Sequence, residues 1–449
     1  MKPLLSIAAD LAAGRTSSQA LVEQALARID APQGEGARAY RQVSRAAALA
    51  SARASDQLRA QGIVASPLAG IPVSVKDLFD VAGEVTRAGS KVLADAPPAA
   101  RDAVVVQRLR AAGSIIMGRT NTVEFAFSGL GLNPHYGTPK NPWDRATGRI
   151  PGGSSAGAAV SVADGMAAMG LGTDTGGSVR IPAALCGLTG FKPTARRIPK
   201  DGTFPLSHTL DSIGPIACSV TCCALTDSIL AGLAAELPEV LTLSGLRLGV
   251  VQDYVLEGLD DPVARAFDRA LSRLSRAGAQ IMKMRFPALS ELPDINRNGG
   301  LVLPESYAIH RELIGARQAE YDPRVAMRIL RGAKMSAADY IDVQTRRAAM
   351  IRESARIAAP FDALLMPTVP QLAPSIASLE HDDQRYNQTD YAVLRNTSVV
   401  NFLDGCALTM PCHEPDDGPV GLMLVGQGDG DRRLFAVGLA VEAALQSPN

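Results

Sequence analysis

A serine that follows two glycines is the first candidate for chemistry in this chain. Residues 172–180 read GTDTGGSVR, which places Ser178 directly after Gly176 and Gly177 and just beyond an apolar run. Glycines at such a point let the backbone turn sharply and leave its N–H groups open. N–H groups held in this way stabilise an oxyanion in known enzymes, at about 3–4 kcal/mol each. A glycine-rich turn that caps a helix in SVRIPAAL fits the stretch equally well.

A second serine-rich stretch, PGGSSAG at residues 151–157, precedes an alanine-rich segment. Serines in this position ordinarily cap the N-terminus of a helix. That interpretation explains one serine better than it explains Ser154 and Ser155 together with two glycines. Glycines at a helix N-terminus also bind phosphate. The Gly-Lys-Ser/Thr ending of a phosphate-binding loop is missing here, however, so a phosphate site is disfavoured.

Lys76 stands at the end of an apolar run in VSVKDLF. Because a buried ammonium group is costly, a lysine in this position needs an explanation. One interpretation, which this stretch alone favours, is a lysine that reaches the surface and pairs with Asp77. The other is a desolvated lysine whose pKa is lowered until it can act as a base.

No pattern in the sequence ties a histidine to these serines. A serine nucleophile normally takes a histidine as its base, and the G-x-S-x-G turn of many serine hydrolases is absent around Ser178. The histidines lie in polar, loop-like or helical-surface segments; they are His135, His208, His310, His381 and His413. A Ser–Lys arrangement is therefore a better interpretation than a Ser-His-Asp triad.

The segments that must position these side chains alternate between strand and helix patterns. Strands are predicted at 70–76, 114–118, 169–173, 245–251, 362–368, 408–410 and 420–425. Helices are predicted at 4–14, after a capping box at 16–19, and at 40–61, 100–112, 156–168, 261–278 and 432–445, with a charged helical surface layer over 300–360. Residues 128–157 and 190–215 are loop-rich, and a loop as long as the first is usually functional. The alternation predicts an α/β fold.

Composition limits the class of function. The 449 residues are 47% apolar and 20% charged, which is typical of a globular protein with a sizeable core. Lys+Arg and Asp+Glu both number 45, so the net charge gives no indication of a nucleic-acid partner. We expect one continuous domain over 1–449, with a catalytic core at 60–220 and a variable helical surface region at about 285–345.

Cysteine usage and hydropathy point to a reduced, non-membrane setting. The six cysteines are Cys186, Cys218, Cys222, Cys223, Cys406 and Cys412. They lack zinc-ligand spacing, and we expect buried reduced thiols in a cytoplasmic protein. Asp10 interrupts the apolar N-terminal stretch, which is too short for a signal peptide, and no uncharged apolar run is long enough to span a membrane.

The three candidate stretches together resemble the amidase signature family. The resemblance rests on GIPVSVKDLF, PGGSSAG and GTDTGGSVRIPAALCGLTGFKPT, and it continues in EFAFSG, KNPWD, LDSIGPIA, DALLMPT and PVGLMLVG. It covers most of the chain and is weakest over 285–345. It implies an α/β fold with a large, mixed but mostly parallel, twisted sheet that helices cover on both faces. It also implies an amide-cleaving hydrolase that needs no metal or cofactor.

The family's Ser–cis-Ser–Lys catalytic set maps onto this sequence residue by residue. The resemblance places the nucleophile at Ser178, the bridging serine at Ser154 and the base at Lys76, and it implies a cis peptide bond between Gly153 and Ser154. It places the oxyanion hole on the N–H groups of Thr175, Gly176 and Gly177, with Ser178 as a further donor. Supporting residues fall at Ser155, Asp174 and Arg180, and the segment that lines the acyl side falls at Ala126, Phe127 and Ser128.

The substrate is the least determined feature. The chain departs from many relatives at Ala156, where they have glycine, and at Met423, where they have glutamine. Arg196, Arg197 and Lys200 in the variable loop 195–212 suit a solvated face or an acidic substrate. The apolar surroundings favour a neutral hydrophobic amide, anilide or carbamate, hydrolysed by a monomer or homodimer without nucleic-acid or membrane partners. The alternatives are the glutaminase component of a tRNA-dependent amidotransferase and a catalytically silent scaffold.

Overall fold

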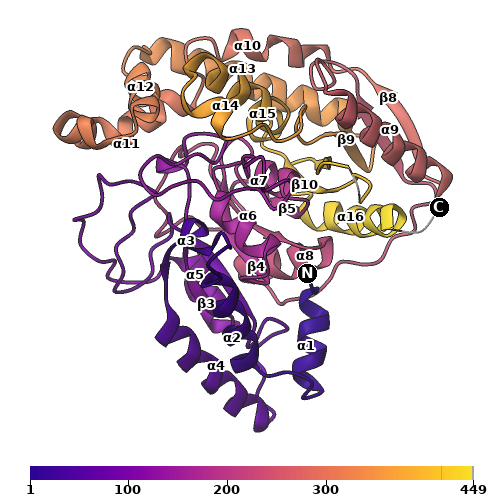
Figure 1. The fold of residues 1–449 in the computed structure, drawn as a ribbon. Coiled ribbons are helices and arrows are strands. Elements are labelled where there is room, and N and C mark those ends of the chain that lie inside the picture. Colours follow the sequence, from indigo (N-terminus) through magenta and orange to yellow (C-terminus); the bar gives the residue numbers. More distant parts are fainter. Residues whose placement is uncertain (416, 447–449) are drawn as a thin grey trace.

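A single sheet of 11 strands runs through the molecule (Figure 1). The computed structural model describes residues 1–415 and 417–446. The strands are β1 (Tyr40–Val43), β2 (Pro72–Lys76), β3 (Ile115–Thr120), β4 (Met169–Asp174), β5 (Thr189–Lys192), β6 (Ser212–Ala217), β7 (Arg247–Val251), β8 (Gln280–Met284), β9 (Ala363–Pro367), β10 (Cys406–Pro411) and β11 (Gly421–Gly426). They lie side by side in the order β1-β3-β2-β4-β6-β5-β10-β11-β9-β7-β8.

Helices cover both faces of this sheet (Figure 1). The α-helices are α1 (Leu4–Ala12), α2 (Ser18–Ile29), α3 (Gly36–Ala39), α4 (Arg45–Ala60), α5 (Val104–Ala111), α6 (Ala156–Ala163), α7 (Arg180–Leu185), α8 (Val220–Leu230), α9 (Asp261–Arg276), α10 (Leu292–Ile295), α11 (Val302–Arg317), α12 (Pro323–Gly332), α13 (Ala337–Ala358), α14 (Ala377–Glu380), α15 (Asp383–Phe402) and α16 (Asp431–Gln446). Short 3-10 helices are η1 (Glu124–Ala126), η2 (Pro287–Glu291) and η3 (Gln318–Glu320).

The two helical layers enclose separate apolar clusters. On one face α5, α8, α9 and α16 pack on the sheet around residues such as Val75, Leu171 and Leu408. On the other face α2, α4, α6 and α7 bury residues such as Val160 and Val179. The predicted α/β class, with one large mixed sheet between helices, is confirmed. None of the described helices has the length and hydrophobicity that a membrane span requires.

The prediction that the sheet is mostly parallel is wrong. Parallel pairing joins β2 to β3 and β4, and β7 to β8 and β9. The other neighbours, from β4 through β6, β5, β10 and β11 to β9, and the edge pair β1 and β3, are antiparallel. Parallel neighbours need a crossover, usually a helix, whereas antiparallel ones do not. The link from β5 to β6 contains no helix, and this pair is antiparallel.

Two segments differ from their predicted secondary structure. Residues 190–215, predicted as loop, contain most of β5 and the first part of β6, both fully buried. Pro215 lies inside β6, where a proline argues against an interior strand because it lacks the N–H donor. Residues 40–61, predicted as one helix, begin with β1, because β3 offers an open edge with which Tyr40–Val43 can pair.

Local capping explains where several helices begin and end. Ser17 caps α2 by accepting a hydrogen bond from the Ala20 N–H, so the cap is Ser17 and not a box formed by Thr16 and Gln19. α6 ends at Ala163, earlier than the predicted 168, because Gly165 adopts a left-handed conformation. The predicted helical layer over 300–360 is confirmed as α11, α12 and α13.

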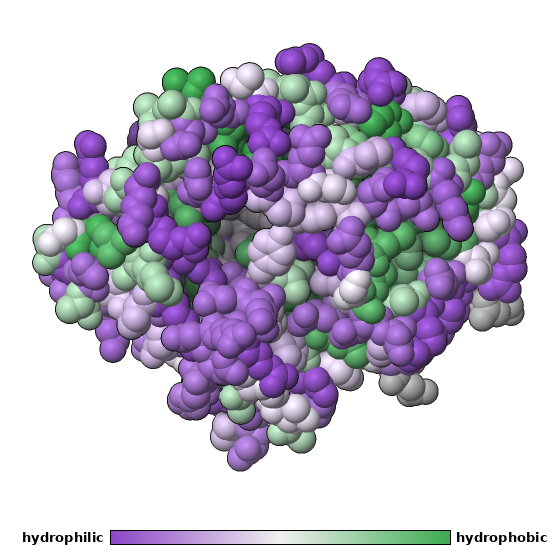
Figure 2. Space-filling view, turned by 90° about the horizontal axis from the view of Figure 1, so that it is seen from above, coloured by the Kyte–Doolittle hydropathy of each residue, from purple (hydrophilic) through white to green (hydrophobic). Residues whose placement is uncertain are grey.

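Figure 2, seen from above, shows a mostly hydrophilic face of the molecule in which a hollow opens.

Candidate active site

Strand β2 directs Lys76 into the interior. Ser74 and Lys76 alternate with buried valines, and the Ser74 hydroxyl meets Ser161 of α6 at 2.8 Å. The Lys76 side chain is fully buried, and its Nζ donates to Ser154 Oγ at 2.7 Å and to Thr173 Oγ1 at 2.8 Å. Asp77 instead pairs with Arg119 at 2.7 Å. The interpretation of Lys76 as a surface lysine paired with Asp77 is therefore wrong.

Burial changes the protonation of Lys76. Removal from water disfavours the charged ammonium and lowers the pKa of Lys76 to about 7, although the carboxylates of Asp174 and Asp211 act in the opposite direction. A large share of the Lys76 amines is therefore neutral near pH 7. A neutral amine beside a serine hydroxyl is able to accept a proton.

The peptide bond between Gly153 and Ser154 is cis, as predicted. The loop that carries it is held on both sides. The Gly153 N–H donates to the Gly129 carbonyl at 2.7 Å, and the Ser154 carbonyl accepts from the Thr122 hydroxyl at 2.9 Å. A Cβ on Gly153 would lie 2.5 Å from the Gly131 nitrogen, so only glycine fits. The loop thereby holds the Ser154 hydroxyl against Lys76.

Ser178 lies in the turn between β4 and α7 and is buried. Its carbonyl accepts from the Ser155 N–H at 3.2 Å, and Ser155 Oγ donates to the Thr173 carbonyl at 3.4 Å. The serine loop and the Ser178 turn are therefore adjacent. Among the described residues, however, no hydrogen bond joins the hydroxyls of Ser154 and Ser178.

Asp174 and Arg180 form a fully buried ion pair behind Ser178. Arg180 donates to both oxygens of Asp174, at 2.9 and 3.0 Å, and Asn401 of α15 joins them with hydrogen bonds to each. Burial alone would raise the pKa of the Asp174 carboxyl, but the Arg180 guanidinium holds it well below its usual range. Met423 is fully buried, and its sulfur accepts from Arg180 Nη1 at 3.3 Å.

The backbone N–H groups before Ser178 are differently engaged. The Gly177 N–H donates to Asp174 Oδ1 at 2.9 Å. In the described part of the chain, the N–H groups of Thr175, Gly176 and Ser178 donate to no protein acceptor. Thr175 Oγ1 is fixed by Asp211 Oδ1 at 2.5 Å, and burial raises the pKa of that carboxyl.

Comparisons with known proteins show the family of the chain. The family model described as Amidase matches residues 20–435. The chain belongs to the amidase signature family. It is therefore a hydrolase that acts on amide-type carbon–nitrogen bonds.

Individual relatives match over nearly the whole chain. The chain is 39% identical to 2-amino-5-chloromuconic acid deaminase from Comamonas testosteroni, over 91% of this chain and 88% of that protein. It is 35% identical to a glutamyl-tRNA(Gln) amidotransferase component from Chloroflexus aggregans, over 96% and 94% respectively. A solved structure described as an amidase superimposes with a TM-score of 0.90 at 34% identity, covering 98% of this chain and 99% of that one.

The segment that the amidase resemblance assigns to the acyl side lies in an apolar cluster. Ala126 and Phe127 pack there with Leu206 of the variable loop and with Tyr321 and Val325 beside and on α12. Ser128 Oγ instead donates to Asp390 Oδ1 of α15 at 2.7 Å. The 285–345 region of this amidase therefore packs against the segment 126–128.

The three cations of the variable loop 195–212 have protein partners. Arg196 pairs with Asp404 at 3.0 Å and also with Asp429, and Arg197 pairs with Asp227 at 2.7 Å. Lys200 Nζ donates to the His208 carbonyl at 2.9 Å. Each of these cations is therefore already engaged by a group of the protein.

Two buried or half-buried histidines form hydrogen bonds away from the serine–lysine cluster. His310 is fully buried and shares a hydrogen bond with Tyr321 at 3.0 Å, while His135 pairs with Glu124 at 2.7 Å. Among the described residues no histidine bonds to Ser154 or Ser178. This agrees with the preference for a Ser–Lys arrangement over a Ser-His-Asp triad.

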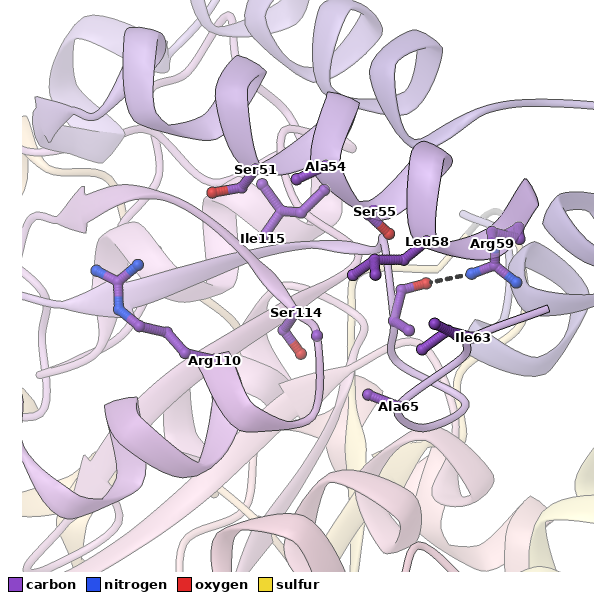
Figure 3. A pocket seen from close by; sticks show the side chains of 12 residues that line it. Ser51, Ala54, Ser55, Leu58, Arg59, Ile63, Ala65, Arg110, Ser114 and Ile115 are labelled. Carbon is purple, nitrogen blue, oxygen red and sulfur yellow. Dashed lines mark hydrogen bonds between the residues drawn. The ribbon is translucent and has the colours of Figure 1, made fainter. Parts of the chain in front are cut away.

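A separate pocket of about 260 Å³ lies between α4 and the start of β3 (Figure 3). Leu58, Arg59 and Ser114 contribute to its lining, and Arg59 Nη2 donates to the Ala69 carbonyl at 2.7 Å. It contains none of the predicted site residues, so it is distinct from the serine–lysine cluster.

Sequence reasoning did not single out three residues that complete the cluster. Thr173 is the second hydrogen-bond partner of the Lys76 amine, Asp211 fixes Thr175, and Asn401 joins the Asp174–Arg180 pair. Thr173 and Asp211 lie within motifs that carried the resemblance, GTDTGGS and LDSIGPIA. Asn401 belongs to a helix far along the chain, and no motif pointed to it.

Proposed function

We propose that this amidase cleaves its substrate through a serine acyl-enzyme, with Ser178 as nucleophile, Ser154 as bridging serine and Lys76 as general base. The observation that carries the proposal is the buried hydrogen bond from Lys76 Nζ to Ser154 Oγ at 2.7 Å, on the lysine whose pKa is lowered to about 7. A lysine that is neutral near the working pH is suited to general-base catalysis.

The reaction begins when the Ser178 oxygen attacks the substrate carbonyl carbon. The Ser178 proton passes to Ser154, whose own proton passes to the neutral Lys76 amine. The relay then returns a proton to the leaving nitrogen as the carbon–nitrogen bond breaks. Water, deprotonated by the same route, attacks the acyl carbon and releases the acid and Ser178. The Lys76 ammonium that forms in this step is stabilised inside the protein, because Thr173 and Ser154 accept its hydrogen bonds.

This relay requires a hydrogen bond between Ser154 and Ser178. Catalytic hydrogen bonds are often long in free enzymes and shorten when substrate binds. We propose that the hydrogen bond between the Ser178 and Ser154 hydroxyls forms when the substrate binds. Asp174, Arg180 and Ser155 act as positioning residues, since they hold the turn that carries Ser178.

The oxyanion is stabilised by open backbone donors. Within the described residues, the N–H groups of Thr175, Gly176 and Ser178 donate to no protein acceptor, whereas that of Gly177 already donates to Asp174. The oxyanion hole proposed from the resemblance therefore relies chiefly on the first three. Asp211 supports it by fixing Thr175.

The favoured substrates are neutral hydrophobic amides, anilides or carbamates. The apolar cluster around Ala126, Phe127 and Leu206 supports an apolar acyl or aryl group. A carbamate presents the same planar carbonyl with an amine leaving group, so it needs no further catalytic residue. The name of the Comamonas relative, 2-amino-5-chloromuconic acid deaminase, indicates that its substrate is an acid. The partnered state of Arg196 and Arg197 is the reason for preferring neutral substrates here.

The second candidate function is the glutaminase component of a tRNA-dependent amidotransferase. The likeness to the Chloroflexus amidotransferase component, 35% identical over 96% of this chain, is the observation that favours it. That function predicts hydrolysis of glutamine that depends on partner proteins.

The deciding experiment incubates the purified chain alone with an acyl-p-nitroanilide, an aryl carbamate, a primary aliphatic amide and glutamine, in parallel with Ser178→Ala. Release of amine from the first three substrates by the wild type only supports the proposed function. Activity on glutamine alone, increased by partner proteins, supports the second candidate. Equal turnover by wild type and Ser178→Ala would refute the nucleophile assignment. No turnover by either, over a broad amide library, would favour a silent scaffold.

A further inference from the structure

Three cysteines stand together at the start of helix α8, outside the catalytic cluster. Cys218 follows β6 and is half-buried, while Cys222 and Cys223 in the first turns of α8 are buried. The sulfurs of Cys218 and Cys222 lie 3.9 Å apart. A disulfide has its sulfurs about 2.05 Å apart, so these two must approach by roughly 2 Å to bond.

The surroundings of the Cys222 sulfur favour a thiolate. It accepts hydrogen bonds from the Leu4 N–H at 3.2 Å and from the Ser219 hydroxyl at 3.1 Å. Ser219 caps α8, which places Cys222 at the positive end of the helix dipole. Figure 1 shows α1 and α8 meeting beside the N-terminus.

The hydrogen bond between the two thiols raises the pKa of Cys218 and lowers that of Cys222, so Cys222 is placed to take the proton of Cys218. The hydrogen bond from the Cys218 thiol is the largest cause that lowers the pKa of Cys222, against the effect of burial. Glu442, whose carboxylate accepts from the Val220 N–H at 2.8 Å, acts in the opposite direction. Cys223 differs, because burial raises its pKa and its sulfur donates to the carbonyls of Thr189 and Pro215, at 3.6 and 3.9 Å.

We propose that Cys218 and Cys222 are a thiol modification site, which forms an intramolecular disulfide with low-molecular-weight disulfides such as oxidised glutathione. Cys218 is the half-buried member of the pair and takes the first adduct, and the buried Cys222 resolves it. The site is independent of the proposed amide hydrolysis, because no thiol takes part in that reaction.

The chemistry proceeds by two exchanges. The Cys218 sulfur attacks one sulfur of oxidised glutathione while its proton moves to Cys222 along their hydrogen bond. A protein–glutathione disulfide forms, and one glutathione thiolate leaves. Cys222 then attacks the Cys218 sulfur, and the second glutathione leaves with the proton of Cys222. Two protein thiols are oxidised to one disulfide, and one oxidised glutathione is reduced to two glutathione molecules.

The disulfide has a consequence for α1. Sulfur in a disulfide carries no negative charge, so the Leu4 N–H loses a strong acceptor when the bond forms. Leu4, Ile7 and Leu11 still pack in the core, so α1 stays attached through its apolar side. Oxidation should therefore loosen the first turn of α1 without detaching the helix.

The test incubates the full, folded chain with oxidised glutathione, then unfolds it in denaturant with N-ethylmaleimide so that every remaining thiol is alkylated, and reads it by intact mass and peptide mapping. The wild type should lose two of its six alkylatable thiols, joined as a Cys218–Cys222 disulfide. Cys218→Ser should lose none. Cys222→Ser should stop with one glutathione on Cys218. Cys223→Ala, the matched control beside the pair, should lose two thiols as the wild type does.

Three outcomes would overturn the proposal. One is a wild type that keeps all six thiols after equilibration with the oxidant. Another is a Cys218→Ser variant that still loses two thiols. The third is a wild type that accumulates a stable glutathione adduct with no internal disulfide, because Cys222 would then not resolve it.

Discussion

The amine of Lys76 lies 2.7 Å from the hydroxyl oxygen of Ser154, 78 residues further along the chain. Both side chains are fully buried, and the lysine has no carboxylate within hydrogen-bond distance among the described residues. A lysine held in this way is weakly basic. Its contact with a serine on a cis peptide is the arrangement on which the proposed chemistry depends.

The pH dependence of the reaction should follow Lys76. The neutral amine is the active form, so kcat/KM should rise as pH passes through about 7 and then level off. Lys76→Met should reduce kcat/KM by about 10²–10⁴-fold, the usual contribution of a general base. Initial rates between pH 5.5 and 9.5 provide the measurement. A wild-type profile that is flat across neutral pH would contradict the assignment.

The same lysine should make stability depend on pH. Its pKa in the folded protein, about 7, lies below the usual lysine value of 10.5, so between these values the unfolded chain binds more protons. Stability should therefore increase with pH in this window, on the order of 1 kcal/mol per pH unit. Urea unfolding of the wild type and of Lys76→Met at pH 7.5 and 9.5 isolates this effect from that of Lys192, whose pKa is also lowered. An equal pH dependence in both proteins would argue against a buried neutral lysine.

Removal of the proposed nucleophile should abolish turnover without unfolding the protein. The Ser178 hydroxyl makes no hydrogen bond among the described residues, so Ser178→Ala leaves no partner unsatisfied. We expect roughly a 10³-fold or larger loss in kcat and an unchanged thermal midpoint. Ser66→Ala, at a serine outside the site, is the control for kcat. A kcat within tenfold of the wild type would remove Ser178 from its role.

The buried pair of Asp174 and Arg180 should be far more important for stability than a surface pair. Asp174→Asn leaves the Arg180 guanidinium without its counter-ion in the interior, which costs about 3–5 kcal/mol. Asp294→Asn removes a carboxylate that is half exposed beside Arg297 and Arg346, and its effect on the free energy of unfolding should be much smaller, because water and salt screen an exposed pair. Urea unfolding of both variants checks the contrast. Similar losses in the two variants would show that the buried pair is not special.

Two neighbouring glycines should respond differently to alanine. A Cβ on Gly177 would lie 2.2 Å from Thr397 Oγ1 and 2.6 Å from Ile181 Cδ1, and its φ of +136° is unfavourable for other residues. A Cβ on Gly176 meets only Ser398 Oγ, at 3.2 Å, and Leu394 Cδ2, at 3.4 Å. Gly177→Ala should lose activity and stability together, whereas Gly176→Ala should keep its N–H donor and most of its stability. Thermal unfolding and kcat of both variants provide the measurement, and the reverse order would contradict it.

Local patterns were sufficient to mark the two serine stretches as candidates and to predict most of the regular elements. GTDTGGS and PGGSSAG each fitted a helix cap as well as a catalytic role, and the family resemblance, not the residues alone, chose Ser154 from the serine pair and assigned the nucleophile to Ser178. Apolar runs bounded by glycine or proline predicted β2, β4 and β9 to within a few residues. Side-chain periodicity and turn chemistry act over a few residues, and these features depend on little else.

Features that join distant segments depended on the tertiary structure. Residues 212–215 were predicted as loop, and they belong to β6 because β4 and β5 lie on either side of it. The sequence allowed Lys76 to pair with its neighbour Asp77, but in the folded chain Asp77 pairs with Arg119 of β3. Asn401 carried no motif, yet it reaches Asp174 across 227 positions. Strand pairing and the choice of ion-pair partner depend on which remote groups meet when the chain folds. The pKa of a buried lysine depends on which remote groups exclude water from it, and local sequence patterns do not specify these contacts.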